Sequence, residues 1–302
     1  MPNTIAHLGV NLLATRAALP AAGTKWILAG ALLPDLPWIL QRLLRAGLPE
    51  IPAIDLRLYV AAQASLLGCL LLAGAIALLT RRPRVTFAIL ALGALLHLVL
   101  DALQTKLANG VLLLAPVDWT LWNAGLFWPE DWPTLALTLA GLAAAVWMAR
   151  SAPPDLADLH LPGAAAGLGI AALLGLYLAG PLATMSAIER GDAYSTATLR
   201  AHDDRTGRTI EIDRNRYDAA ARTLTAWTGE GFALTGTLPE HDTTLSLAGR
   251  FVDPSTISVE RYHEHPPGLR DGAATLGIAF VAGYWLWAAL RTLRRWRRLA
   301  GG

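Results

Sequence analysis

The sequence predicts a mainly α-helical protein, a polytopic membrane bundle of about six to seven segments with a small β-rich soluble domain inserted before the last span. Hydrophobic residues make up 54% of the chain and charged residues only 16%, against roughly 25% charged in an average soluble protein. The apolar residues gather into stretches long enough to cross a hydrocarbon core. One long stretch is instead charged and alternates apolar with polar residues, which is typical of strands.

The apolar segments follow one another along the first half of the chain. Residues 5–19 form a short segment, and whether it crosses the membrane fully is left open. Residues 26–44 come next and contain Pro34 and Pro37, which predict a kink because proline frees part of the helix backbone. The clearer spans are expected at about 58–80, 85–104, 133–149, 163–187 and 272–290.

These segments define four regions. We expect a membrane bundle over 1–150, a linker with an additional transmembrane helix over 151–187, a soluble domain over 188–271, and a last helix with a basic tail over 272–302. Arginines in short loops mark the cytoplasmic side. They cluster between two spans and after the last one, at Arg81, Arg82, Arg84, Arg291, Arg294, Arg295, Arg297 and Arg298. The C-terminus is therefore expected in the cytoplasm and the soluble domain outside it.

The soluble region carries about five short strand patterns. They are expected near 194–202, 207–214, 231–238, 243–252 and 255–262, with a helical stretch over 216–227. Five strands and one helix suggest a sandwich or a small barrel like the oligonucleotide/oligosaccharide-binding (OB) barrel. The region has ten arginines and fourteen acidic residues, so its net charge argues against binding to nucleic acid.

Four ionisable residues lie inside apolar segments, where charge is costly and often functional. His97 and Asp101 are four residues apart, which places both side chains on one face of a helix. His7 and Asp35 lie in the first two segments. Imidazole and carboxylate groups are suitable ligands for a divalent metal such as zinc. The alternative is that His97 and Asp101 bond each other within the bundle and that His7 lies at the membrane interface.

Three other features are weaker candidates for functional residues. His263 and His265 would face the same way on a strand and could bind a metal, but a solvated strand end is the preferred interpretation. Asp118 is interpreted as an ordinary interface residue rather than a support for the site. Cys69 is the only cysteine, so the chain forms no internal disulfide, and a buried inert thiol is expected.

The order of motifs in the first half resembles a known family. His7 is followed by Leu33-Pro34-Asp35, by the stretch from His97 to Thr105, and by Gly110 with Leu113-Leu114-Ala115-Pro116. This arrangement resembles bacterial membrane-bound metal-dependent hydrolases, which are distantly similar to zinc-dependent phospholipase C and single-strand nucleases. The resemblance covers roughly residues 1–150. It implies a bacterial inner membrane, and metal-ligand roles for the four residues, His7, Asp35, His97 and Asp101, with zinc favoured and manganese as the alternative.

One motif of the family is missing. Members usually carry an HRGxTHS-like motif between the LPD and HxxxD elements, whereas residues 56–65 here contain no histidine. Gln63 or Ser65 would stand in the place of a lost ligand. The departure predicts a site that holds fewer metal ions or binds them more weakly.

The predicted function is metal-assisted hydrolysis of a phosphoester or lipid-like substrate at the outer side of the membrane. Asp35 or Asp101 would orient or deprotonate the attacking water. Two alternatives are kept. In one, the metal site is degenerate and the protein is not an enzyme, and residues 188–271 bind a cell-envelope partner. In the other, His97 and Asp101 relay protons in a transporter.

Overall fold

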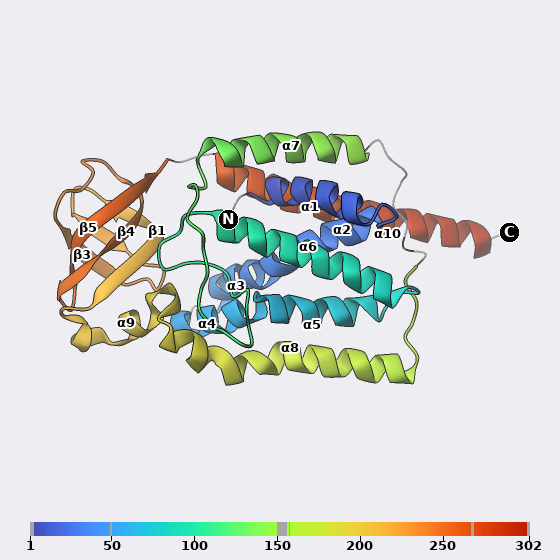
Figure 1. The fold of residues 1–302 in the computed structure, drawn as a ribbon, viewed down its shortest axis with the longest axis horizontal. Helices are drawn as coiled ribbons and strands as arrows, with labels where there is room; N and C mark the ends of the chain where they lie inside the picture. The colour runs from blue at the N-terminus through green and yellow to red at the C-terminus, as the bar shows by residue number, and fades with distance from the viewer. Residues whose placement is uncertain (1–2, 49, 150–155, 157, 267–268, 301–302) are drawn as a thin grey trace.

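The chain forms a helical bundle with a five-stranded barrel at one end (Figure 1). The computed structural model describes residues 3–48, 50–149, 156, 158–266 and 269–300. The bundle contains helices α1 to α8 and α10, and α10 ends on the side of the bundle opposite the barrel. The helical elements of the bundle are α1 Thr4–Ala18, α2 Thr24–Leu32, the 3₁₀ turn η1 Leu33–Asp35, α3 Leu36–Gly47, α4 Ala53–Gln63, α5 Leu66–Ala77, α6 Pro83–Leu103, α7 Trp132–Ala149, α8 Ala164–Arg190 and α10 Leu269–Ala300.

Several of these helices have the length and composition of membrane spans, so this is a membrane protein. Within the described residues, four helices qualify, and the bent pair α4–α5 makes a fifth if it is counted as one span. The four are Thr24–Gly47, Pro83–Leu103, Ala164–Arg190 and Gly272–Arg294. Helix α1 has 15 residues, and the apolar part of α7 is also short, which is why length alone does not fix six or seven crossings.

The span expected at 58–80 is divided into two helices. Helices α4 and α5 meet at an angle of 62°. Ser65 begins α5 as its N-cap, because its hydroxyl accepts a hydrogen bond from the Gly68 amide at 3.1 Å. A Cβ on Gly68 would lie 2.2 Å from the carbonyl oxygen of Gln63, so glycine is required for the two helices to meet this closely. The apolar segment expected at 58–80 is thus a bent pair of helices, and the bend was not predicted because hydropathy does not register a cap inside an apolar run.

Helices α2 and α6 pack closely through small residues. A Cβ on Gly93 would lie 2.8 Å from the carbonyl carbon of Gly30, so the two backbones touch at this point. Such contacts are the usual means by which helices approach each other in lipid. One turn further along α6, His97 lies beside the carbonyl oxygen of Ala31. The glycine contact therefore sets the position of His97 against α2.

The barrel is closed, with strand order β1-β2-β3-β5-β4. Its strands are β1 Thr209–Asp218, β2 Thr223–Thr225, β3 Gly231–Thr235, β4 Thr243–Asp253 and β5 Thr256–His265. Neighbouring strands are antiparallel except β3 and β5, which are parallel. Alternate residues of the strands fill the interior, with Phe232 and Phe251 in edge-to-face contact at 5.4 Å.

Two local predictions in this region were wrong. Residues 194–202, expected as a strand, contain the helix α9 Thr196–Arg200, flanked by the 3₁₀ turns η2 Ala193–Ser195 and η3 His202–Arg205. Asp192 accounts for this, because its carboxylate accepts hydrogen bonds from the amides of Ala197 and Thr198 at 2.7 and 3.1 Å. Residues 216–227, expected as a helix, form the end of β1 and all of β2. Pairing with the neighbouring strands overrides the helix propensity of the alanines there.

Candidate metal centre

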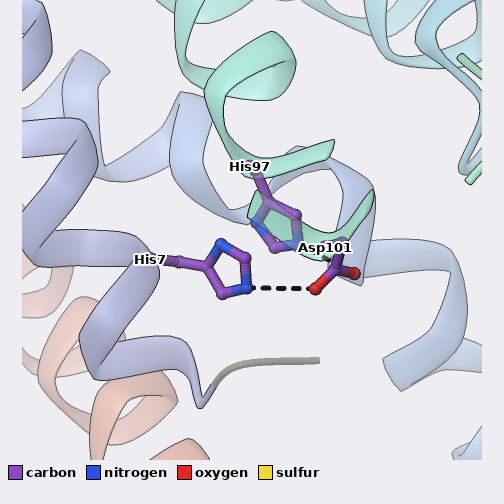
Figure 2. Close-up of side chains that lie close together, drawn as sticks. All are labelled: His7, His97 and Asp101. Atoms are coloured by element: carbon purple, nitrogen blue, oxygen red, sulfur yellow. Dashed lines mark ion pairs between the residues drawn. The ribbon is translucent and has the colours of Figure 1, made fainter. Parts of the chain in front are cut away.

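Three buried side chains meet at the end of the bundle that faces the barrel. His7 comes from the first turn of α1, and His97 and Asp101 come from the last turns of α6 (Figure 2). One ligand atom from each of the three lies within 4.8 Å of the other two. The imidazole rings of His7 and His97 stack with centroids 3.7 Å apart. The structure thus brings His7 to two residues that follow it by 90 or more positions in the sequence.

The separations between the polar atoms match a shared cation better than hydrogen bonds. His7 Nε2 lies 3.4 Å from Asp101 Oδ1. His97 Nε2 lies 3.9 Å from Asp101 Oδ2 and 3.6 Å from Asp35 Oδ1. Ligand atoms that surround one tetrahedral ion at zinc–ligand bond lengths are about 3.3–3.6 Å apart. Asp35, at the end of η1, lies beside the cluster through its contact with His97.

The tautomer of His97 leaves one ring nitrogen available as a ligand. Its Nδ1 lies 2.6 Å from the carbonyl oxygen of Ala31. A carbonyl oxygen only accepts hydrogen bonds, so Nδ1 carries the proton and Nε2 keeps a free lone pair. A backbone carbonyl in this position is a common means of orienting a metal-binding histidine.

Several atoms of the cluster are buried without a hydrogen-bond partner among the described residues. They are both ring nitrogens of His7, Nε2 of His97, Oδ2 of Asp35 and Oδ1 of Asp101. Buried polar groups are nearly always paired, since leaving one unpaired costs about 1–3 kcal/mol. The three side chains that meet, with Asp35 beside His97, therefore form a candidate site for a metal ion.

A lysine that the sequence interpretation overlooked joins this cluster. Lys106 is buried, and its Nζ lies 3.6 Å from Asp101 Oδ2. Lys106 follows the end of α6 by three residues. Its closeness in sequence to the intramembrane carboxylate of Asp101 could have identified it as a residue of the site. Its ammonium group partly neutralises Asp101 and places a positive charge at the edge of the site.

A cavity of about 300 Å³ opens beside the cluster. Asp35, His97 and Asp101 lie in its wall, so these side chains are accessible to a small ligand. The wall continues through Tyr194 and Asp213, which belong to the segment before the barrel and to strand β1. The site therefore lies between the bundle and the barrel.

The residues proposed as replacements for the missing histidines point their polar atoms elsewhere. The amide nitrogen of Gln63 faces the hydroxyl of Tyr59 and the carbonyl of Tyr177, both at 3.4 Å. The hydroxyl of Ser65 donates to Ala62 O at 2.6 Å while it caps α5. Cys69 is buried. In the described structure, the candidate metal ligands therefore come from α1, η1 and α6.

The remaining candidates lie outside the cavity wall. Asp118 is exposed, and hydrogen bonds from Thr120 hold the pKa of its carboxyl below the usual value. His263 stacks on Trp128 with ring centroids 3.8 Å apart, and burial, with the nearby His265, lowers its pKa. His265 is only 2% exposed, so the strand end is not solvated as expected.

His265 belongs to an ion-pair cluster that joins the bundle to the barrel. It contacts Glu130, which precedes α7, and donates to or accepts from Ser246 at 2.7 Å. Arg214 Nη1 lies 3.0 Å from Glu130 Oε1 and 2.8 Å from His265 Nδ1. Glu130, His263 and His265 are close enough to hold a metal. The guanidinium of Arg214 already supplies a positive charge there, so we interpret this group as an electrostatic link between the domains.

Replacing Glu130 by glutamine should destabilise the protein near neutral pH. Burial raises the pKa of Glu130, but the hydrogen bond and charge of His265, with Arg214, outweigh it and lower the pKa from 4.5 to about 2. The charged form thus stabilises the fold above about pH 4.5, and this contribution is lost as the pH falls toward 2. Because the side chain is partly exposed, we expect a loss of about 1 kcal/mol at pH 7.

Thermal unfolding of the detergent-solubilised protein at pH 7 and at pH 3 would measure this difference. The difference in unfolding temperature between wild type and Glu130→Gln should be smaller at pH 3 than at pH 7. Glu240→Gln, at an exposed position of the barrel, is the matched control and should change neither curve. Equal stability of Glu130→Gln and wild type at pH 7 would show that the link contributes nothing.

In comparisons with known proteins, no family model, no curated protein and no solved structure matches this chain. Membership of the hydrolase family that residues 1–150 resemble therefore stays a prediction.

Proposed function

We propose that the protein is a membrane-bound metal-dependent hydrolase of the family that its first 150 residues resemble. The observation that supports this most is the convergence of His7, His97 and Asp101, with Asp35 beside them, on one buried point at the wall of a cavity. Zinc is the favoured ion, with manganese as the alternative, since both accept imidazole and carboxylate ligands.

The residues of the site have distinct proposed roles. A bound divalent ion would lower the pKa of a water molecule and polarise a phosphoryl or acyl oxygen. Asp35 is the carboxylate placed to accept the proton of that water, because its Oδ2 has no partner. Asp101 is the proposed third ligand beside the two histidines, and one of its oxygens faces each ring. Lys106 lies beside Asp101 and would stabilise negative charge that develops on the substrate.

The proposed location of the reaction is the outer side of a bacterial inner membrane. If α1, α2–α3, α4–α5, α6, α7, α8 and α10 each cross, seven segments alternate in direction along the chain. The loop that carries Arg81, Arg82 and Arg84 and the end of α10 then share the side away from the barrel (Figure 1). That side is cytoplasmic by the distribution of arginines. A phosphoester or lipid-like amphiphile could reach the cavity from the outer leaflet.

The barrel is proposed to be OB-like and to cover the site. The strand order β1-β2-β3-β5-β4 and the parallel pairing of β3 with β5 support this assignment. The surface of the barrel remains a candidate for a cell-envelope partner, and its acidic balance argues against nucleic acid.

Phosphoester hydrolysis by the purified protein would test the proposal. The full chain in detergent, supplied with Zn²⁺ or Mn²⁺, should release p-nitrophenol from bis(p-nitrophenyl) phosphate or phosphate from short-chain phosphatidic acid. Asp101→Asn should lower kcat at least about a hundredfold, the range expected when a preorganised charged group is removed. Asp118→Asn, on an exposed loop, is the matched control and should retain full activity.

The alternative without catalysis predicts a different result. Metal-loaded wild-type protein that cleaves neither substrate would contradict the hydrolase proposal for phosphoesters. Cellular function that survives Asp101→Asn but not deletion of residues 190–270 would favour a protein whose barrel binds an envelope partner.

A further inference from the structure

An arginine without an acidic partner lines the cavity beside the candidate metal centre. Arg57 projects from α4 into the cavity wall and is half-buried. Its Nε is buried without a hydrogen-bond partner, and no described carboxylate lies within ion-pair distance of it, although Asp213 in the same wall acts on its charge from further away. Burying an unpaired cation is costly, so this position requires a physical explanation.

Aromatic rings from both domains surround this guanidinium. Its central carbon lies 4.4 Å from the ring centroid of Tyr194 and 4.3 Å from that of Trp227, with Trp38 further away at 5.9 Å. Contacts with ring faces stabilise the positive charge without using its N–H groups. The guanidinium therefore keeps donors available for a ligand.

The ring of Tyr194 is held in place at some cost. Its backbone has φ of 58°, in the left-handed region that non-glycine residues rarely adopt. The carboxylate of Asp192 accepts hydrogen bonds from the amides of Ala197 and Thr198, which fixes the following turn. From the bundle, Arg45 donates to the carbonyl oxygen of Trp227 at 2.7 Å, which fixes the second ring.

The cavity wall carries a small excess of positive charge, with four cations against the carboxylates of Asp35, Asp101 and Asp213. Arg42, Arg45 and Lys106 line it in addition to Arg57. Among these four cations, Lys106 has a carboxylate within ion-pair distance, and that carboxylate is Asp101 of the candidate metal centre. Arginine presents a planar set of donors that matches the oxygens of phosphate.

We propose that this cavity binds a phosphate group and that Arg57, held between Tyr194 and Trp227, is its main anchor. The inference deepens the proposed function by naming the ligand chemistry, and it rests on that function for the claim that the bound molecule is a substrate. It also gives the domain over 188–271 a role in ligand binding, because this domain supplies two of the rings around Arg57, those of Tyr194 and Trp227.

Calorimetric titration of the full chain in detergent, after removal of metal with a chelator, would test this inference. The probes are inorganic phosphate, dihexanoyl phosphatidic acid and, as a zwitterionic comparison, dihexanoyl phosphatidylcholine. Arg57→Gln should weaken phosphate binding about ten- to a hundredfold, as for the loss of a charge-assisted hydrogen bond. Arg57→Lys, which keeps the charge but loses the planar donors, should give an intermediate affinity.

A control variant and two contradicting outcomes make the phosphate site testable by itself. Arg208→Gln removes an exposed arginine of the barrel and should leave phosphate binding unchanged. Wild-type protein that binds no phosphate probe, or equal affinity in Arg57→Gln, would overturn the inference. Tighter binding of phosphatidic acid than of phosphate would support the site with a lipid headgroup as the source, and the reverse order would support it with free phosphate.

Metal content of the protein before chelation distinguishes failure of the inference from failure of the hydrolase. Protein that contains no metal but binds phosphate through Arg57 would refute the hydrolase and leave the anion site standing. Metal-loaded protein whose phosphate affinity is unchanged by Arg57→Gln would refute the phosphate site at Arg57 and leave the hydrolase proposal standing.

Discussion

Replacing His97 by alanine is expected to abolish metal binding by the purified protein. His97 is the central residue of the cluster, since it stacks on His7 and its Nε2 faces both Asp35 and Asp101. Loss of an outer-shell partner already costs ten- to a hundredfold in metal affinity. Loss of a direct ligand should therefore cost more than about a hundredfold and leave the isolated protein nearly free of zinc or manganese.

Metal content is measured by mass spectrometry of protein purified in detergent without chelator. His160→Ala is the matched control, because His160 is exposed and lies near the start of α8, outside the cluster. The control should contain as much metal as the wild type. Wild-type protein without bound metal would refute the metal centre, and a His97→Ala protein with full occupancy would place the ion elsewhere.

Replacing Gly93 by leucine should destabilise the bundle and remove the bound metal together. A side chain at position 93 collides with the backbone of Gly30, where a Cβ alone would come within 2.8 Å. Overpacking of this kind costs about 1–3 kcal/mol, and more where the obstacle is backbone. Helix α6 would shift away from α2, and the hydrogen bond between His97 and Ala31 would break.

Thermal unfolding and metal content of the same preparation would report both effects. Gly175→Leu is the matched control in α8, where a Cβ meets no atom within 4 Å. It should unfold at the wild-type temperature and retain its metal. If Gly93→Leu kept both properties, close packing of α2 and α6 would not determine the position of His97.

The sequence was informative where a property depends on residues near one another in the chain. Hydropathy located the apolar helices, and four of the five expected strands overlap observed ones. The spacing of His97 and Asp101 predicted their common face, because a helix has a fixed period. The bend at Ser65, where a single cap divides an apolar run, was not predicted. The helix expected over 216–227 was wrong, because strand pairing with distant residues outweighs local propensity there.

The sequence by itself determined that this is a membrane protein with a charged β domain, and it identified His7, Asp35, His97 and Asp101 as candidate ligands. Only the tertiary structure brought His7, His97 and Asp101 together with Asp35 beside them, added Lys106, and placed Arg57 among aromatic rings from two domains. The physical reason is that hydropathy and periodicity are local properties of the chain. A cavity between a bundle and a barrel depends on contacts between residues more than a hundred positions apart.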